Sequence, residues 1–318
     1  MLKCVYFGTP PIAAHILEVL LKSACCEIVG VVTRMDRPQG RSSQLIPSAV
    51  KVVAQQAGLP LWQAPRMHLP ESLEWLKERQ ADLFIVVAFG EILRQVVLDL
   101  PRLGCINVHA SLLPAYRGAA PMQWSLIHGD AVTGITIQKM VLACDAGDLL
   151  GQSSLAIDPN WTRAELELAL ENLSGPLLQK TILELEAGTA VAVSQDESQV
   201  TWAPKIELAD CALDFHRPAL ELHHLICGVS PEPGAWCWKQ APGKACRLRV
   251  LRSAVASAEK ADRQPGDGWI EGKHLYVACG EGVLELLAVQ LEGKALQPIQ
   301  AFINGLQSRS LQLGISAP

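Results

Sequence analysis

Short apolar runs alternate with helical patterns along the first half of this 318-residue chain. The apolar run Cys4–Gly8 leads into Pro11–Leu21, where apolar residues recur at the spacing of one helix face. Leu83–Phe89 is apolar throughout, as expected of a strand that is buried on both faces of a parallel sheet. Because alternating strands and helices fold by crossover connections, this pattern predicts a doubly wound, mostly parallel α/β sheet.

The same patterns give residue ranges for the first half. The expected strands are Cys4–Gly8, Glu27–Thr33, Leu83–Phe89, Gly104–Val108, Gly134–Met140 and Leu149–Ile157. The expected helices are Pro11–Leu21, Ser48–Gly58, Glu71–Arg79, Glu91–Leu98, Ala120–His128 and Arg163–Glu186. Sheets of this kind hold their ligands beyond the carboxyl ends of the strands.

The pattern changes after about residue 190, where short strands and turns replace the alternation. Helices are expected at Pro218–Cys227 and Ala301–Leu306. The strands expected between them are Ala235–Lys239, Cys246–Ser253, Gly268–Ile270, His274–Cys279 and Val283–Gln290. Strands at this spacing predict a small β-barrel. We therefore expect domains at 1–190 and 207–318, joined by a linker at 191–206.

Composition narrows the class of protein. The net charge of −5 argues against a surface coated with base for bulk nucleic-acid binding, although it leaves room for a local basic patch. The 10 cysteines include no C-x-x-C pair, so we expect reduced thiols and no metal site. The amino-terminal residues do not resemble a signal peptide, and the apolar runs are too short to cross a bilayer. We expect a cytoplasmic protein without a membrane partner.

Three polar residues lie in stretches that are otherwise mostly apolar or turn-forming. Asn107 and His109 are two apart at the end of an expected strand, so both side chains leave the same face. Asp145 comes from a later segment. An amide can donate to a developing oxyanion, an imidazole can move a proton near neutral pH, and a carboxylate can orient the imidazole. This combination suits acyl-group chemistry.

The alternative is that these residues are structural. A histidine at a strand end is often a satisfied structural residue, and an asparagine before a loop is often a turn residue. Pro114, Gly118 and Pro121 favour function, because they indicate a stiffened loop at the edge where such sheets bind ligands. Asp148 is expected to be a solvated turn carboxylate. Arg117 is expected to be structural, on the surface or near a ligand.

A dinucleotide site is not expected. Gly8 is followed by Thr9 and two prolines, so the first strand lacks the G-x-G-x-x-G fingerprint. The turn opens a helix and could contact an anion at most.

With these residues in place, the chain resembles the methionyl-tRNA formyltransferases along nearly its whole length. The Asn, His and Asp elements are typical of folate-dependent formyltransferases and hydrolases in general, whereas the arginine loop and the carboxy-terminal domain favour the tRNA family. The matching motifs are Phe7–Pro10, Asp36–Arg41, Val86–Gly90, Asn107–His109, Ser111–Pro114, Arg117–Pro121, Asp145–Asp148 and Ala203–Ile206.

The resemblance implies a Rossmann-like catalytic domain, an oligonucleotide-binding-like barrel, and 10-formyltetrahydrofolate as formyl donor. The acceptor would be the α-amino group of methionyl initiator tRNA. Asn107 would hold the formyl oxygen, His109 would stabilise the oxyanion or move the proton, and Asp145 would orient His109 or a relaying water. The residues expected to line the folate pocket are Ser111, Leu112, Leu113, Pro114, Val86, Ala88, Phe89 and Gly90.

Binding of tRNA is expected at Arg37, Arg41 and Lys205, and we expect a monomer. The barrel domain adds a basic group made of Lys244, Arg247, Arg249 and Arg252, of which Arg247 and Arg249 share a strand face. The tail departs from the basic surface that an electrostatic tRNA platform requires. Its charges nearly balance, and Cys227 and Glu232 stand where the family typically carries Arg and Trp.

Two other classes stay open. One is another enzyme of the superfamily: a formyl-folate hydrolase, or a formyltransferase for an amino sugar or glycinamide ribonucleotide. The other is a protein that binds tRNA or folate without turnover, against which the complete set of Asn107, His109 and Asp145 argues.

Overall fold

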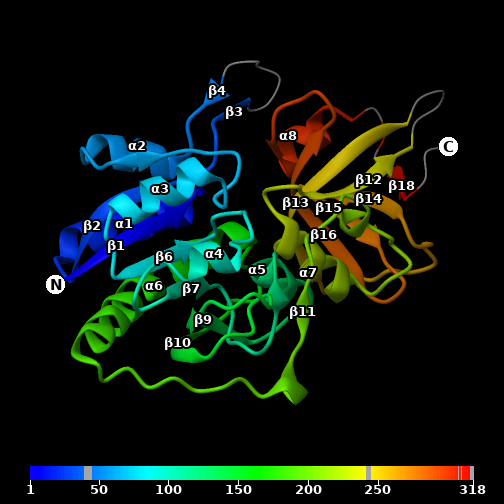
Figure 1. Cartoon of the computed structure of the whole chain (residues 1–318). Helices are drawn as coiled ribbons and strands as arrows, with labels where there is room; N and C mark the ends of the chain where they lie inside the picture. Colours follow the sequence, from blue (N-terminus) through cyan, green and yellow to red (C-terminus); the bar gives the residue numbers. More distant parts are fainter. Residues whose placement is uncertain (39–44, 241–244, 307, 309, 316–318) are drawn as a thin grey trace. The chain divides into compact units, whose positions relative to one another are not determined.

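The structure is a computed structural model that describes residues 1–38, 45–240, 245–306, 308 and 310–315 (Figure 1). It forms two compact units, neither of which is continuous in sequence. The sheet unit comprises Met1–Gly118, Thr133–Leu155 and Glu167–Ala203. The barrel unit comprises Ala119–Val132, Ala156–Leu166 and Pro204–Pro318.

The sheet unit is built on seven strands in the order β10-β9-β7-β6-β1-β2-β5 (Figure 1). Their bounds are β1 Leu2–Gly8, β2 Cys26–Val32, β5 Leu61–Trp62, β6 Leu83–Val87, β7 Cys105–His109, β9 Val132–Lys139 and β10 Leu149–Ala156. The pairs from β5 through β2, β1 and β6 to β7 are parallel. The chain winds from β1 to β5 on one side and from β6 to β10 on the other, which confirms the predicted doubly wound sheet.

Five helices accompany these strands: α1 Pro11–Ser23, α2 Ala49–Gln56, α3 Pro70–Glu78, α4 Gln95–Leu98 and α6 Arg163–Ala187. α1 and α3 begin at a proline, which suits the first turn because that position needs no N–H donor. α2 begins after Ser48, whose hydroxyl accepts from the Lys51 N–H. Local capping thus explains why these three helices start where the sequence indicated.

The barrel unit closes a sheet on itself. Its strands are β12 Ala235–Lys239, β13 Cys246–Ala256, β14 Asp267–Glu271, β15 His274–Ala278, β16 Val283–Leu291, β17 Gln297–Pro298 and β18 Ser310–Gly314. They follow the order β13-β12-β18-β14-β15-β16-β17, and antiparallel pairing of β13 with β16 closes a six-stranded barrel. The core contains buried residues of α7 (Ala219–Val229) and α8 (Ile299–Asn304). The predicted barrel is confirmed.

Several details differ from the sequence expectations. α4 starts at Gln95 and not at Glu91, because the Glu91 carboxylate bonds to Arg34 and to the Met67 N–H instead of lying in a helix. β9 runs antiparallel to β7. The helix α5 (Pro121–Ile127) belongs to the barrel unit because it packs on α7, so the compact units differ from the contiguous domains expected. Short strands that were not expected are β3 Arg37–Pro38, β4 Leu45–Ile46, β5, β8 Arg117–Gly118, β11 Trp202–Ala203, β17 and β18.

Candidate active site

The carboxyl end of β7 carries the two polar residues that the sequence indicated. Asn107 and His109 alternate with buried apolar residues and leave the same face of the strand. The antiparallel neighbour β9 places Gln138 opposite Asn107 and Thr136 opposite His109. Cross-strand partners share a face, so four polar side chains from two strands lie together.

Asp145 reaches this group from the connection between β9 and β10. Its Oδ1 lies 3.5 Å from Asn107 Nδ2 and 3.6 Å from His109 Nδ1. Its Oδ2 accepts a 2.9 Å hydrogen bond from the Gly118 N–H. The structure therefore brings the three predicted catalytic residues together, although their separations of 3.5–3.6 Å are longer than direct hydrogen bonds.

The imidazole of His109 lies between two acceptors. Its side chain is only 6% exposed, and Nε2 lies 2.9 Å from the Tyr116 carbonyl oxygen while Nδ1 faces Asp145. A neutral ring has one N–H and can donate to one of these oxygens, whereas an imidazolium can donate to both. To act on a substrate through Nε2, His109 must leave the Tyr116 carbonyl.

Two neighbours that the sequence analysis missed surround the Asp145 carboxylate. Gln138 Nε2 donates to Oδ1 at 2.9 Å. The Cys144 thiol lies 3.3 Å from Oδ2, and partial burial together with the Asp145 charge raises its pKa to about 11, so the thiol keeps its proton and can donate. Neither residue forms part of a recognisable motif, so only the fold could reveal these contacts.

Two glycines allow the backbone to close around Asp145. A Cβ on Gly147 would lie 1.8 Å from the Lys139 carbonyl oxygen, and a Cβ on Gly118 would lie 2.5 Å from the Ala203 carbonyl oxygen, so a side chain at either position would clash with the backbone. Gly118 also has a φ of 128°, which favours glycine. Asp145 itself has a φ of 50°, an uncommon left-handed conformation for a residue with a side chain.

The loop after β7 is held by internal hydrogen bonds. Ser111 is fully buried, and its hydroxyl donates to the Ala115 carbonyl at 2.6 Å. Thr136 Oγ1 donates to the Ser111 carbonyl at 2.7 Å and accepts from the Leu113 N–H at 3.0 Å. Gln152 Nε2 donates to the Leu113 carbonyl at 2.8 Å. The Ser111 side chain thus stabilises the loop, and its expected place in the folate pocket stays a prediction.

Arg117 is buried and holds the segment that was expected to be a linker. Its guanidinium donates to Gln195 Oε1 at 2.8 Å and to Glu197 Oε1 at 2.7 Å. The same hydrogen bond lowers the pKa of the Glu197 carboxyl. Gln195 Nε2 in turn donates to the Asp145 and Gly147 carbonyls at 2.8 and 2.7 Å. Arg117 is therefore structural, as one of the sequence interpretations held, and it stabilises the Asp145 turn through Gln195.

The residues expected to line the folate pocket from β6 fall into two groups. Val86 and Phe89 are buried in the core of the sheet unit, where Phe89 packs edge-on against Phe7 at 5.5 Å. Ala88 and Gly90 are exposed just beyond the strand. A Cβ on Gly90 would meet no atom within 4 Å, so space is open at this edge of the sheet.

The expected tRNA contacts are only partly described. Arg37 is exposed on β3, which pairs with β4 as a short hairpin. Arg41 lies outside the described residues. Lys205 is 79% exposed and 3.7 Å from Glu207, a surface pair that contributes little to stability. The segment before Arg37 is fixed by Lys51, which bonds to Asp36 at 2.6 Å.

The basic group of the barrel is mostly paired within its own unit. Arg249 bonds to Gln290 and lies 3.2 Å from Glu232, and Arg252 pairs with Glu165. The guanidinium of Arg247 stacks on Trp236 at 4.1 Å. Lys244 lies outside the described residues. The arginines of this group are therefore less available for phosphates than the sequence suggested.

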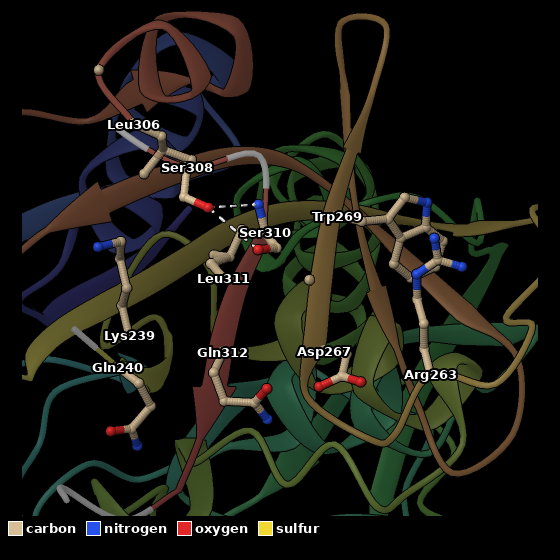
Figure 2. Close-up of a pocket in the computed structure, with 12 residues that line it drawn as sticks. Lys239, Gln240, Arg263, Asp267, Trp269, Leu306, Ser308, Ser310, Leu311 and Gln312 are labelled. Carbon is tan, nitrogen blue, oxygen red and sulfur yellow. Dashed lines mark hydrogen bonds between the residues drawn. The ribbon is translucent and has the colours of Figure 1, made fainter. Parts of the chain in front are cut away.

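A separate pocket of about 870 Å³ lies between β12, β14 and β18 of the barrel (Figure 2). Lys239 and Arg263 contribute positive charge to its wall, and Asp267 contributes negative charge. The Arg263 guanidinium covers the Trp269 ring at 4.1 Å, as the close-up shows. No carboxylate of the described chain forms an ion pair with Lys239 or Arg263.

In the described part of the chain, no group of three or more His, Cys, Asp and Glu side chains is arranged to hold a metal ion. Among the same residues, no helix combines the length and apolar character needed to cross a bilayer. All 10 cysteines, each within the described ranges, are free thiols.

Comparison with known proteins identifies the family. Residues 2–182 match the formyl transferase family and residues 205–307 match the formyl transferase C-terminal domain. The chain is 43% identical over 312 residues to the methionyl-tRNA formyltransferase of Protochlamydia amoebophila strain UWE25, covering 98% of this chain and 97% of that protein. It is 44% identical over 313 residues to the methionyl-tRNA formyltransferase of Chlamydia muridarum strain MoPn / Nigg, covering 98% of both.

The fold also resembles a solved structure of lower identity. WlaRD, a sugar 3N-formyl transferase whose structure was solved in the presence of dTDP and 5-N-formyl-THF, superposes with a TM-score of 0.65 at 14% identity. The match covers 93% of this chain and 99% of that chain. At this identity the likeness shows the fold alone. The sequence matches are stronger, and they extend over both the sheet unit's strands and the barrel, so the chain belongs to the formyl transferase family.

Proposed function

We infer that this chain transfers a formyl group from a folate donor to the α-amino group of methionyl initiator tRNA, the reaction that prepares the initiator for translation. The observation that carries this function is the similarity to methionyl-tRNA formyltransferases, at 43–44% identity over 98% of the chain, barrel included. The Asn107, His109 and Asp145 group at the end of β7 supplies matching chemistry.

The reaction begins when the neutral amine attacks the formyl carbon. An α-amino group has a pKa of about 7.7–8.0, so a fair fraction is already neutral near physiological pH. The new C–N bond forms as the carbonyl π electrons move to oxygen, giving an oxyanion to which Asn107 Nδ2 donates. The bond to the donor nitrogen then breaks, and the proton lost by the amine goes to that leaving nitrogen.

In this scheme His109 stabilises the oxyanion or transfers the proton, and Asp145 stabilises the charge on His109. When His109 is protonated, its Nδ1–H faces Asp145 and its Nε2–H can turn from the Tyr116 carbonyl toward the oxyanion or the leaving nitrogen. The Asp145 carboxylate stabilises that imidazolium and fixes the ring. Because both side chains are mostly buried, water screens their interaction weakly.

The donor is proposed to be 10-formyltetrahydrofolate. Membership of the formyl transferase family and the folate present in the WlaRD structure support a folate donor. The open space at Gly90 and the exposed Ala88 suit the pteridine end beyond β6, and Leu112, Leu113 and Pro114 would form the facing wall. No step requires a metal ion in this scheme.

The acceptor tRNA is proposed to contact Arg37, Arg41 and Lys205. Arg37 and Lys205 are exposed, which phosphate binding requires. In the barrel, Lys239 and Arg263 are further candidates because no described carboxylate pairs with either side chain. Residues 1–190 would form the catalytic domain and 207–318 the tRNA-binding domain of a cytoplasmic monomer.

The test is a transfer assay with purified protein. Formyl transfer from 10-formyltetrahydrofolate is measured with methionyl initiator tRNA, with water and with an amino sugar as acceptors. We expect transfer to methionyl-tRNA to exceed the other two by orders of magnitude. Faster hydrolysis, or preference for the amino sugar, would refute the assignment.

A further inference from the structure

Gln138 lies inside the active-site group without a motif to explain it. Its side chain is almost fully buried, at 2% exposure for the residue, and it projects from β9 beside Asn107 on β7. Burial of a polar side chain is unfavourable unless all its groups find partners. A purely structural position on this buried strand could be filled by an apolar residue.

The two ends of the Gln138 amide have different surroundings. Nε2 donates to Asp145 Oδ1 at 2.9 Å, whereas Oε1 is buried without a hydrogen-bond partner among the described residues. Flipping the amide would place Oε1 against the Asp145 carboxylate, which repels it while Asp145 is ionised. The ionised carboxylate therefore selects the observed orientation, even though it leaves Oε1 unsatisfied.

Gln138 makes the shortest contact to the oxygen on which the site depends. Asp145 Oδ1 is 2.9 Å from Gln138 Nε2 but 3.5 Å from Asn107 Nδ2 and 3.6 Å from His109 Nδ1. Gln138 thus fixes where this oxygen lies, 3.6 Å from the imidazole that it faces.

We propose that Gln138 is a positioning residue for the formyl transfer: its amide holds the Asp145 carboxylate facing His109, at the cost of its own unsatisfied carbonyl. This inference rests on the proposed function. The other charged or titratable groups around Asp145 are His109 on β7, Cys144 on the same turn, and Arg117 through Gln195.

The first variant is Gln138→Met, which keeps the volume and removes both polar ends. Thermal stability should stay unchanged or rise, because the unsatisfied oxygen disappears along with the donor. The kcat for methionyl-tRNA should fall about tenfold or more with little change in KM. A residue with only a structural role would show the reverse, with stability lost and kcat unmoved.

The second variant, Gln138→Glu, tests the donor itself. A glutamate carboxylate would lie against Asp145 Oδ1 and repel it in place of the lost donor, so kcat should fall below that of Gln138→Met. A kcat that falls in the order wild type, Gln138→Met, Gln138→Glu is the specific signature of positioning through a hydrogen bond. Equal kcat values in the two variants would contradict it.

The matched control is Gln95→Met on α4. Gln95 also donates to an aspartate, Asp99 Oδ1, at 2.6 Å, but this pair is exposed and lies outside the site, so its loss should leave kcat unchanged. A wild-type kcat in Gln138→Met would overturn this inference alone. A wild-type chain that transfers no formyl group to methionyl-tRNA would overturn the proposed function and the inference together.

Discussion

Replacing Asp145 with Asn separates the charge of this residue from its shape. The Oδ1 side of the carboxylate faces three nitrogen donors and the Oδ2 side faces the Gly118 N–H. An amide NH2 would therefore meet a donor in either orientation. A flip of the Gln138 amide would place its Oε1 as an acceptor against this NH2, and Oε1 loses no hydrogen bond in the flip because it has no partner among the described residues. We expect Asp145→Asn to fold with little loss of stability.

The catalytic loss can be worked from the distance to His109. A carboxylate and an imidazolium 3.6 Å apart attract by about 5 kcal/mol at an effective dielectric constant of about 20. With about 1.4 kcal/mol per factor of ten, loss of this attraction when His109 is protonated in the transition state lowers kcat by about 10³. The serine-protease analogue loses about 10⁴ in the corresponding change, so the two estimates agree within tenfold.

The assay is formyl transfer at saturating folate and methionyl-tRNA, with folate and tRNA binding measured separately by titration. Asp148→Asn is the matched control, because Asp148 Oδ1 only accepts from Ser194 at 3.0 Å and lies outside the Asn107, His109 and Asp145 group. We expect its kcat to stay within a few-fold of wild type. A kcat for Asp145→Asn within tenfold of wild type would refute the electrostatic reasoning, as would a loss explained entirely by weaker binding.

Further predictions address neighbouring features. Asn107→Ala and His109→Ala should each lower kcat by about 10²–10³ while the thermal unfolding midpoint shows an intact fold; near-normal turnover in either variant would remove the mechanism. Arg117→Lys, which cannot reach Gln195 and Glu197 together, should lower the free energy of unfolding by about 1–3 kcal/mol in denaturant titration. An unchanged free energy of unfolding would show that the hydrogen bonds of Arg117 to these two residues contribute nothing to stability. Burial lowers the pKa of His223, so below about pH 6.5 the unfolded chain binds a proton that the folded chain resists, and the free energy of unfolding should decrease as the pH is lowered. In His223→Gln this decrease, measured by calorimetry, should be shallower, and an equally steep decrease would contradict the prediction. Arg41→Ala should raise the KM for methionyl-tRNA far more than that for folate, with partial recovery at low salt, whereas equal effects on both substrates would exclude the loop as the tRNA contact.

Element type was readable from the chain because it depends on local patterns. The continuous apolar run at β6 and the helical stripe of α1 reflect burial on a sheet and on one helix face, so both were predicted within a few residues. The two-residue strands β8 and β11 could not be predicted, since their pairing of Arg117 with Trp202 joins segments far apart in sequence. The start of α4 was wrong for the same reason: Arg34 and Met67 bind Glu91 across the sheet unit.

The doubly wound sheet, the barrel, and the shared strand face of Asn107 and His109 could be predicted from the residues alone, because periodicity of two and 3.6 residues is a local property. The surroundings of Asp145 could not be predicted in this way. Gln138, Gly118 and Gln195 reach its two oxygens and its carbonyl from three separate segments. Hydrogen bonds between distant segments depend on how the whole sheet unit packs, and no spacing along the chain encodes them.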